Sequence, residues 1–316
     1  MSLVSPVRYA YLGPEGTFTE AAVRTLGDPE QASYLPMPSV PAALEAVRQG
    51  EADSALVPLE NSIEGPVPIT LDELATGELL LITREVLLPV TFAVMARPGV
   101  ELAAVTRIGT HPHAEAQCRR WLSAHATNAT VVPTLSTAAA AAALADGNAA
   151  FQAAIAAPQA AERYQLTLLA QGVGDNPRAV TRFLLLSKPG SLTAPTSADK
   201  TSLVAFIADD HPGALLEILE QFAVRGVNLT RIESRPTGDG LGRYCFSIDC
   251  EGHIQDARVG EVLMGLRRVC PRVRFLGSYP RADGAQPALQ RGTSNQEFSD
   301  ATAWLDQLRQ DTNPIG

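Results

Sequence analysis

The chain has 316 residues, of which 46% are hydrophobic and 5% aromatic, and 34 acidic against 25 basic side chains give a net charge of −9. This acidic balance, without any polybasic run, argues against a nucleic-acid or anionic-membrane partner, because both attract clustered Lys and Arg. No uncharged apolar stretch is long enough to span a membrane, and no signal-peptide apolar region precedes the first strand, so we expect a cytoplasmic protein.

Strand-like and helix-like runs alternate along residues 1–187, which predicts an α/β domain with mostly parallel sheets. Strands are expected at 7–13, 53–61, 85–99, 107–111, 130–134 and 181–187, and helices at 17–27, 39–50, 112–125 and 136–148. Thr17 and Glu20 form a T-x-x-E capping box, and Ser136 is a typical N-cap. The alanine-rich run 149–156 fits either a strand or a helix. The four cysteines form no CxxC pair, which indicates free, reduced thiols.

A Pro-, Gly- and Ser-containing stretch at 188–200 is typical of a linker. Beyond it, residues 201–280 read as strand, helix, strand, strand, helix, strand, which is the ferredoxin-like βαββαβ order. Residues 281–316 form a polar tail in which Phe298, Thr302, Leu305 and Leu308 suggest a short amphipathic helix.

Three short motifs have simpler explanations than ligand binding. The run "GPEGT" at 13–17 lacks the lysine of a phosphate loop, and "GDGLG" at 238–242 lies between two strands, where it predicts a hairpin turn. The pair His111 and His113 has no obvious acidic or cysteine partner, so we expect no metal there.

Polar residues stand repeatedly where strands turn into helices. They occur at 16–18, at 110–111 and at 136–138, and the polar loop 58–67 closes a further strand. Helix N-termini suit carboxylates or phosphates, and ligands of open α/β sheets bind at the carboxyl ends of strands. Each position alone could be an ordinary N-cap. Together with Thr181 and Arg182 at the mouth of an apolar strand, they predict a site for a small anion.

The chain resembles the prephenate dehydratase family in "YLGPEGTFTEAA", "VPLENSIEGPV", "THPHAEAQC", "LSTAAAA" and "VTRFLLL", and "GALLEIL" and "NLTRIESRP" resemble the ACT regulatory domain. The likeness runs from about residue 7 to 280, in family order. It implies that prephenate loses carbon dioxide and water to give phenylpyruvate in phenylalanine biosynthesis, with no metal or organic cofactor. It also implies a monofunctional enzyme, with no mutase domain before the first strand.

The resemblance implies an α/β fold with a two-lobed, periplasmic-binding-protein-like catalytic domain over 1–187 and a ferredoxin-like ACT domain over 201–280. The first lobe would use about 1–84 and 165–187, and the second about 85–164.

By the same resemblance, Thr181 would donate the proton, Arg182 would clamp a substrate carboxylate, and Phe183 would support both from beneath the strand. The substrate pocket would contain Thr17, Glu60, Asn61, Ser62, Gly65, His111, Ser136, Thr137 and Ala138. Of these, Glu60 is expected to orient its neighbours rather than to touch a dianion.

Phenylalanine is the implied allosteric effector, bound between two ACT domains of a homodimer or homotetramer. The implied residues are Gly213, Ala214, Leu215, Leu216, Asn228, Leu229, Glu233, Ser234 and Arg235. Gly213 would let a carboxylate approach the free N–H groups of the following helix.

Three positions depart from the family pattern: Ala179 replaces an asparagine, Ala157 a serine and Gln165 a glycine. Two other functions stay open at this point. One is a non-catalytic amino-acid sensor with the same fold, and the other is dehydration of arogenate, in which an amine replaces the side-chain ketone.

Overall fold

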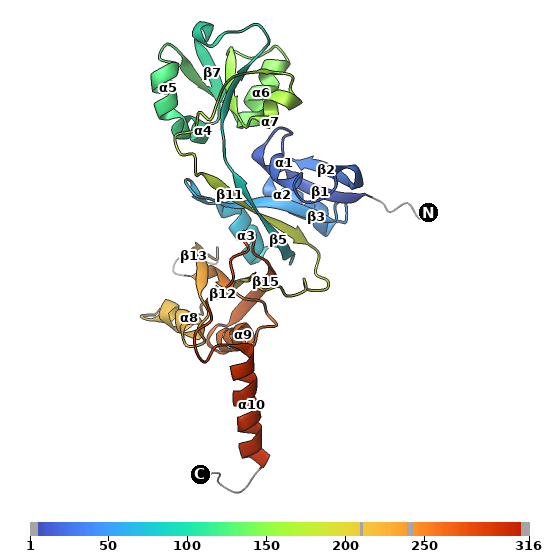
Figure 1. The fold of residues 1–316 in the computed structure, drawn as a ribbon, viewed down its shortest axis with the longest axis vertical. Coiled ribbons are helices and arrows are strands. Elements are labelled where there is room, and N and C mark those ends of the chain that lie inside the picture. The colour runs from blue at the N-terminus through green and yellow to red at the C-terminus, as the bar shows by residue number, and fades with distance from the viewer. Residues whose placement is uncertain (1–5, 209–210, 239, 241–242, 311–316) are drawn as a thin grey trace, which may run out of the picture. The chain divides into compact units, whose positions relative to one another are not determined.

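The structure is a computed structural model that describes residues 6–208, 211–238, 240 and 243–310. These residues separate into two compact units (Figure 1). The first unit comprises Met1–Thr70 and Val86–Lys188, and the second comprises Leu71–Glu85 and Pro189–Gly316. No helix in the described ranges is long and apolar enough to cross a membrane.

The first unit contains two sheets. Its elements are β1 (Val7–Leu12), α1 (Phe18–Val23), a 3-10 turn (Pro29–Gln31), β2 (Ala32–Met37), α2 (Val40–Arg48), β3 (Ser54–Asn61), β4 (Gly65–Pro66), the start of α3 (Pro68–Thr76), the end of β5 (Leu81–Pro89), β6 (Ala93–Ala96), a 3-10 turn (Leu102–Ala104), β7 (Arg107–Thr110), α4 (Pro112–Gln117), α5 (Arg119–His125), β8 (Thr130–Pro133), α6 (Thr137–Ala145), β9 (Ala153–Ala156), α7 (Gln159–Arg163), β10 (Thr167–Gln171) and β11 (Val180–Ser187).

The first sheet has the strand order β2-β1-β3-β11-β5, with β4 paired to β3. Strands β1, β2 and β3 run parallel, whereas β11 runs antiparallel to β3. This register places Thr181 opposite Asn61 and Arg182 opposite Glu60. The sheet is therefore the reason why residues 120 positions apart in the chain meet.

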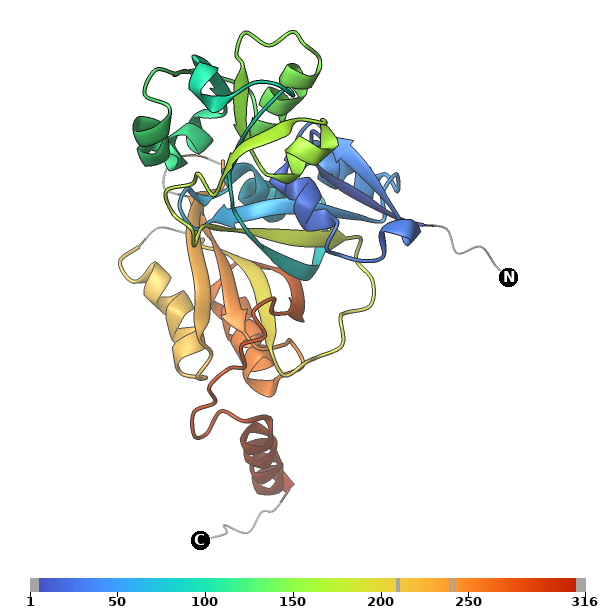
Figure 2. The ribbon, with the colours of Figure 1, turned by 45° about the horizontal axis from the view of Figure 1, so that its top comes forward.

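The second sheet has the order β10-β6-β9-β7-β8 and is covered on both faces (Figure 2). Successive residues of β6 and β9 alternate between two cores, as the period of a strand requires. Val94 and Ile155 pack with Ala114 of α4, whereas Met95 and Ala154 pack with helix α6 on the other face. The alanine-rich run 149–156 therefore resolves as the buried strand β9.

The two sheets form two lobes, and the chain passes between them twice, after β5 and after β10. The predicted α/β, periplasmic-binding-protein-like fold is confirmed. The boundaries differ from those expected, because β10 pairs with β6 and residues 167–171 thus lie in the second lobe. The strand expected at 85–99 is divided between β5 and β6, and the helix expected at 112–125 is broken at Cys118 (φ −115°, ψ 11°).

The structure shows the backbone conformation or burial of two residues that depart from the family pattern, Gln165 and Ala179. Gln165 adopts a left-handed backbone with φ 53°, a conformation that glycine adopts at no steric cost. Ala179 is buried in the core cluster of the second lobe, and its carbonyl accepts a hydrogen bond from the amide of Val90 (2.7 Å). A small apolar side chain suits that position.

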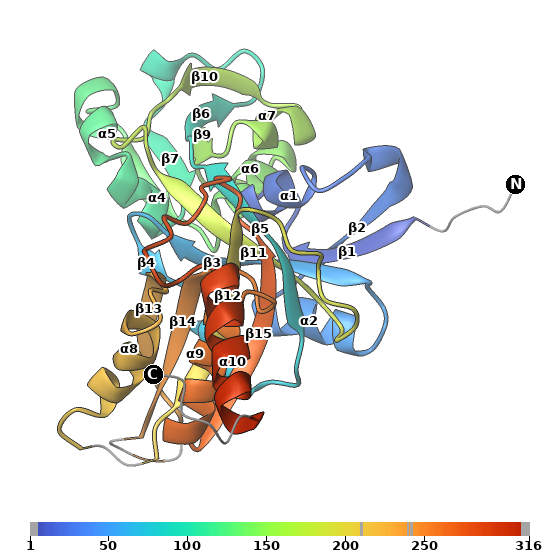
Figure 3. The same cartoon turned by 60° about the horizontal axis from the view of Figure 1, so that its bottom comes forward.

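The second unit is the predicted ferredoxin-like domain (Figure 3). Its elements are β12 (Asp199–Phe206), α8 (Ala214–Ala223), β13 (Leu229–Pro236), β14 (Tyr244–Glu251), α9 (Ala257–Val269) and β15 (Arg272–Pro280), with the strand order β13-β14-β12-β15. Helix α8 buries Ala214, Ile218 and Phe222, so Leu215 is 39% exposed instead of facing the core as its spacing suggests. The tail helix α10 (Asn295–Gln310) buries none of its described residues. Positions 239, 241 and 242 of the predicted hairpin turn lie outside the described residues.

The segment Leu71–Glu85 belongs to the second unit, although its last residues, 81–85, are part of β5, a strand of the first sheet. Two guanidinium nitrogens of Arg235 donate to the carboxylate of Asp72 at 2.9 and 3.0 Å. The side chain of Glu85 is fully buried and forms an ion pair with Lys200 at 3.0 Å. Gly277 has φ +138°, and a Cβ there would lie 2.3 Å from the carbonyl of Ile82, so only glycine fits.

Candidate active site

Thr181 and Asn61 form a hydrogen-bonded pair at the end of the first sheet. The amide Nδ2 of Asn61 donates to the Thr181 hydroxyl at 2.8 Å. The Asn61 carbonyl oxygen accepts from the backbone N–H groups of Ile63 (2.8 Å) and Glu64 (3.1 Å), which fixes the orientation of the amide. Because the threonine oxygen is the acceptor in this pair, its own proton remains for donation to another group.

A cavity of about 280 Å³ lies beside this pair, between the two lobes of the first unit. It is lined by Phe18, Asn61, Val90, Phe92, His111, His113, Ala114, Gln117, Leu135, Ser136, Thr137 and Thr181. The rings of Phe18 and Phe92 meet edge to face with centroids 5.5 Å apart and form an apolar wall. The cavity thus combines an apolar wall with polar groups at one end, as small-molecule sites do.

Neither lysine nor arginine is among the described lining residues of this cavity. The N-terminus of α6 lies at the cavity, where Ser136 is the N-cap and its hydroxyl accepts from the amide of Ala139 at 3.0 Å. The helix dipole and unsatisfied N–H groups favour an anion there. Ser136 and Thr137, where an anion site is expected, both line the cavity.

The two histidines of the "HPH" motif line the same cavity. His111 caps α4, and its ring meets that of His113 edge to face at 4.9 Å. Burial and the neighbouring His113 lower the pKa of His111, while Glu64 opposes this effect. His111 is therefore a neutral group at neutral pH that can accept or donate a hydrogen bond. No cluster of three metal-ligating side chains occurs among the described residues.

The structure does not bring Arg182 to the cavity. Its side chain is buried, with 5% exposure of the residue, and its guanidinium donates to the carboxylate of Glu60 at 2.9 Å. Successive strand residues point to opposite faces, so Thr181 in the cavity sends Arg182 away from it. The partner of Glu60 in this contact is thus Arg182, its neighbour across the strand pair.

The other expected residues have mainly structural contacts. Phe183 lies in the core of the first lobe, and Thr17 caps α1 by accepting from the amide of Glu20 at 3.3 Å. The Ser62 hydroxyl accepts from the amide of Val180 at 3.0 Å, which closes the end of the sheet beside Thr181. Gly65 (φ +84°) shapes the turn after Asn61, and Ala138 is fully buried; neither lines the cavity.

Contacts bridge the two lobes on either side of the cleft. Glu64 accepts from the side-chain amide of Gln117 at 2.9 Å. Elsewhere Glu15 pairs with Arg163, and the Tyr164 hydroxyl donates to the Glu15 carbonyl at 2.7 Å.

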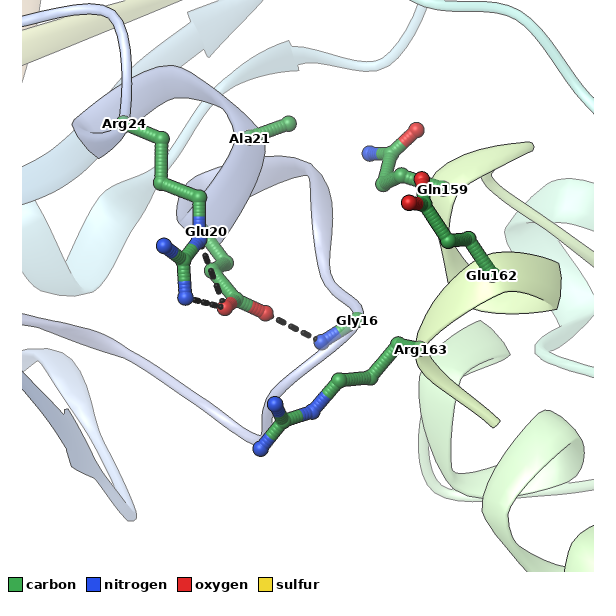
Figure 4. Close-up of a pocket in the computed structure, with 7 residues that line it drawn as sticks. All are labelled: Gly16, Glu20, Ala21, Arg24, Gln159, Glu162 and Arg163. Atoms are coloured by element: carbon green, nitrogen blue, oxygen red, sulfur yellow. Dashed lines mark hydrogen bonds and ion pairs between the residues drawn. The ribbon is translucent and has the colours of Figure 1, made fainter. Parts of the chain in front are cut away.

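A second cavity of about 540 Å³ lies next to this latter contact, between α1 and α7. Figure 4 shows the carboxylate of Glu20 held between Arg24 and the backbone N–H of Gly16, and Arg163 on the facing helix. Both of its arginines already contact carboxylates, so the Thr181 cavity is the better candidate for an anionic substrate.

Several lining residues were not predicted from the sequence. Phe18, Val90 and Phe92 are apolar and read as ordinary core residues. Gln117 has no local signal in the chain, although it is four residues after His113 and thus lies on the same face of α4. Glu64, which contacts Gln117 from outside the lining, was not predicted either.

The second unit has a cavity of about 250 Å³ at the start of α8. It is lined by Ile207, His211, Gly213, Ala214, Leu215, Leu216, Ser234, Tyr244 and Phe246. Gly213 is left-handed (φ +95°) and caps α8, as a glycine there allows. Five of the nine predicted allosteric residues line this cavity. Asn228, Leu229, Glu233 and Arg235 do not, and Arg235 contacts Asp72 instead.

Comparison with known proteins agrees with this architecture. A model of the prephenate dehydratase family matches residues 9–191, and a model of the ACT domain matches residues 202–268. A prephenate dehydratase of Amycolatopsis methanolica is 48% identical over 302 residues, covering 94% of this chain and 96% of its own. One of Mycobacterium tuberculosis is 48% identical over 313 residues, covering 96% and 94%. The crystal structure of a prephenate dehydratase from Arthrobacter aurescens in complex with L-Phe is 54% identical, with a TM-score of 0.92, and covers 96% of this chain and 100% of that one. The chain therefore belongs to the prephenate dehydratase family.

Proposed function

We propose that the prephenate dehydratase reaction of this family takes place in the cavity beside Thr181, with the Thr181 hydroxyl as proton donor. The observation that carries the proposal is the Asn61 contact, which makes the threonine oxygen an acceptor and leaves its proton for the substrate. The apolar wall of Phe18 and Phe92 suits the six-membered ring, and the N-terminus of α6 suits a carboxylate.

In the proposed step, the ring carboxylate leaves as carbon dioxide and the electrons of that carbon–carbon bond complete the aromatic ring. The carbon–oxygen bond at the opposite ring position breaks, and the leaving hydroxyl takes the Thr181 proton and departs as water. Asn61 stabilises the charge that develops on the threonine oxygen, which makes a weak acid a more effective donor. Solvent then returns a proton to Thr181.

Arg182 has a supporting part in this proposal. Its contact with Glu60 crosses the same strand pair as the contact between Thr181 and Asn61, one residue further along. This ion pair, in which Arg182 is buried and Glu60 is partly exposed, fixes the strand from which Thr181 projects. Ser136, Thr137 and His111 bind the substrate carboxylates in place of an arginine.

We further propose that phenylalanine binds the cavity at the start of α8 and controls the enzyme. Its carboxylate would contact the first N–H groups of α8 beyond Gly213, and its ring would contact Ile207 and Phe246. The relative from Arthrobacter aurescens was solved with L-Phe, which supports this effector. We expect a homodimer or homotetramer through the ACT domains, with Asn228 and Leu229 contributed at the interface, and a cytoplasmic enzyme.

A paired assay tests the function. Purified protein is given prephenate or arogenate, and phenylpyruvate and phenylalanine are quantified. The proposal predicts turnover of prephenate at a higher kcat/KM than arogenate. No product from either substrate would indicate an amino-acid sensor, and preference for arogenate would reassign the substrate.

A further inference from the structure

Glu64 connects the proton donor of the first lobe to helix α4 of the second. Its backbone N–H donates to Asn61 Oδ1 at 3.1 Å, so the turn that carries Glu64 is the turn that orients Asn61. Its carboxylate accepts from Gln117 Nε2 at 2.9 Å and lies 3.6 Å from His113 Nδ1. Both Gln117 and His113 line the cavity, whereas Glu64 does not.

Helix α4 is short, and Ala114 is its buried residue. It has six residues and ends at Cys118, where the backbone leaves the helical conformation. Its C-terminal end is held because the Gln117 carbonyl accepts from the amide of Asp175 at 2.6 Å. Its cavity side is held by Glu64. The Glu64 carboxylate accepts from Gln117 Nε2 and lies near His113 Nδ1, so its length places an acceptor at α4 across the cleft.

We propose that Glu64 is a positioning residue for the reaction: it fixes the Gln117 side chain and the turn of Asn61 in one arrangement, so that Thr181 faces a closed cleft. The proposal rests on Thr181 being the proton donor. What matters is an acceptor at the right distance rather than the negative charge. It follows that glutamine should replace Glu64, because its carbonyl oxygen accepts from Gln117, and that aspartate, one methylene shorter, should not.

The test measures kcat and KM for prephenate in Glu64→Gln, Glu64→Asp and Glu64→Ala, with Glu101→Ala as a control that removes a carboxylate at an exposed position of the second lobe. We expect Glu64→Ala and Glu64→Asp to lower kcat/KM about 10- to 100-fold, mainly through kcat, as for other residues that orient a site. Glu64→Gln and the control should stay within about threefold of the parent, the range of a neutral surface change.

The opposite ranking, with Glu64→Asp active and Glu64→Gln inactive, would show that the charge acts and would overturn the proposal. So would unchanged activity in Glu64→Ala. If Glu64→Ala loses its folded structure by thermal melting, the ranking of the Gln and Asp variants decides alone. If the parent protein turns over prephenate and the Glu64 variants keep its kcat/KM, only the positioning role of Glu64 is contradicted. If the parent protein does not turn over prephenate, the proposed function itself is contradicted.

Discussion

The hydroxyl of Thr181 and the amide of Asn61 form a pair with a defined direction. Two backbone N–H groups occupy the Asn61 carbonyl oxygen, so its NH₂ group points at Thr181. A hydroxyl that accepts such a bond is a better proton donor, because the bond stabilises the negative charge left behind. The pairing supports the proposal that this alcohol is the acid, in a cavity whose described lining residues include no lysine or arginine.

Asn61→Asp tests this direction with almost no change in shape. A carboxylate can still accept from Ile63 and Glu64, but it cannot donate to Thr181 and would instead accept the threonine proton. We expect kcat to fall about 10²- to 10³-fold, comparable to loss of a donor that stabilises developing charge. Steady-state kinetics with prephenate measure this fall in kcat, and a thermal melt shows whether the variant is folded. A folded variant with near-parental kcat would refute the idea that Asn61 must donate a hydrogen bond to Thr181.

Single residues were predictable from the sequence only where a motif carried them. Thr181 and Asn61 stand in recognisable segments, and strand pairing places them together. The family resemblance implied that Arg182 binds a substrate carboxylate, but strand alternation turns it to the other face, where it pairs with Glu60. Glu64 could not be predicted because its partner Gln117 is 53 residues away in the other lobe.

At the scale of elements, helix starts were more predictable than strand ends. The cap at Ser136 follows from its hydroxyl and the alanine run behind it, and the structure contains it. The apolar run 85–99 carries no turn signal strong enough to show that it crosses from one sheet to the other between β5 and β6. Helix α3 and strand β2 were not expected, because their prolines and mixed polarity obscure the regular spacing of apolar residues that marks a helix or a strand.

The contact between β5 and β12 contains a buried ion pair that can be tested by stability. Lys200→Met leaves the Glu85 carboxylate buried without its cation, which costs about 3–5 kcal/mol. Urea denaturation should show this loss. The exposed Lys188→Met is the matched control and should be neutral. A Lys200→Met protein as stable as the control would mean that Glu85 is solvated or neutral in the folded state.

For the whole molecule, the boundary between the two units runs through α3 and β5. Residues 68–70 of α3 and 86–89 of β5 belong to the first unit, and 71–85 to the second. Thr70 donates to the carbonyl of Pro58 (2.7 Å), which lies in the strand that ends at Asn61. The chain thus passes from one unit to the other within α3 and within β5, as well as between Lys188 and Pro189.

If phenylalanine controls turnover through two states of the whole molecule, the coupling must be reciprocal. Phenylalanine should weaken binding of the product phenylpyruvate, and phenylpyruvate should weaken binding of phenylalanine by the same factor, about 5- to 150-fold. Isothermal titration of each ligand with and without the other measures both factors. Inhibition by phenylalanine without any mutual effect on affinity would contradict a two-state coupling of this kind.

The most direct test of the account is the turnover of prephenate by Thr181→Val and Thr181→Ser. Valine keeps the shape of threonine without its hydroxyl, whereas serine keeps the hydroxyl. We predict that kcat of Thr181→Val falls about 10²- to 10⁴-fold, the contribution of a positioned proton donor, and that Thr181→Ser keeps most of the activity. A folded Thr181→Val protein with near-parental turnover would contradict the assignment of Thr181 as the proton donor.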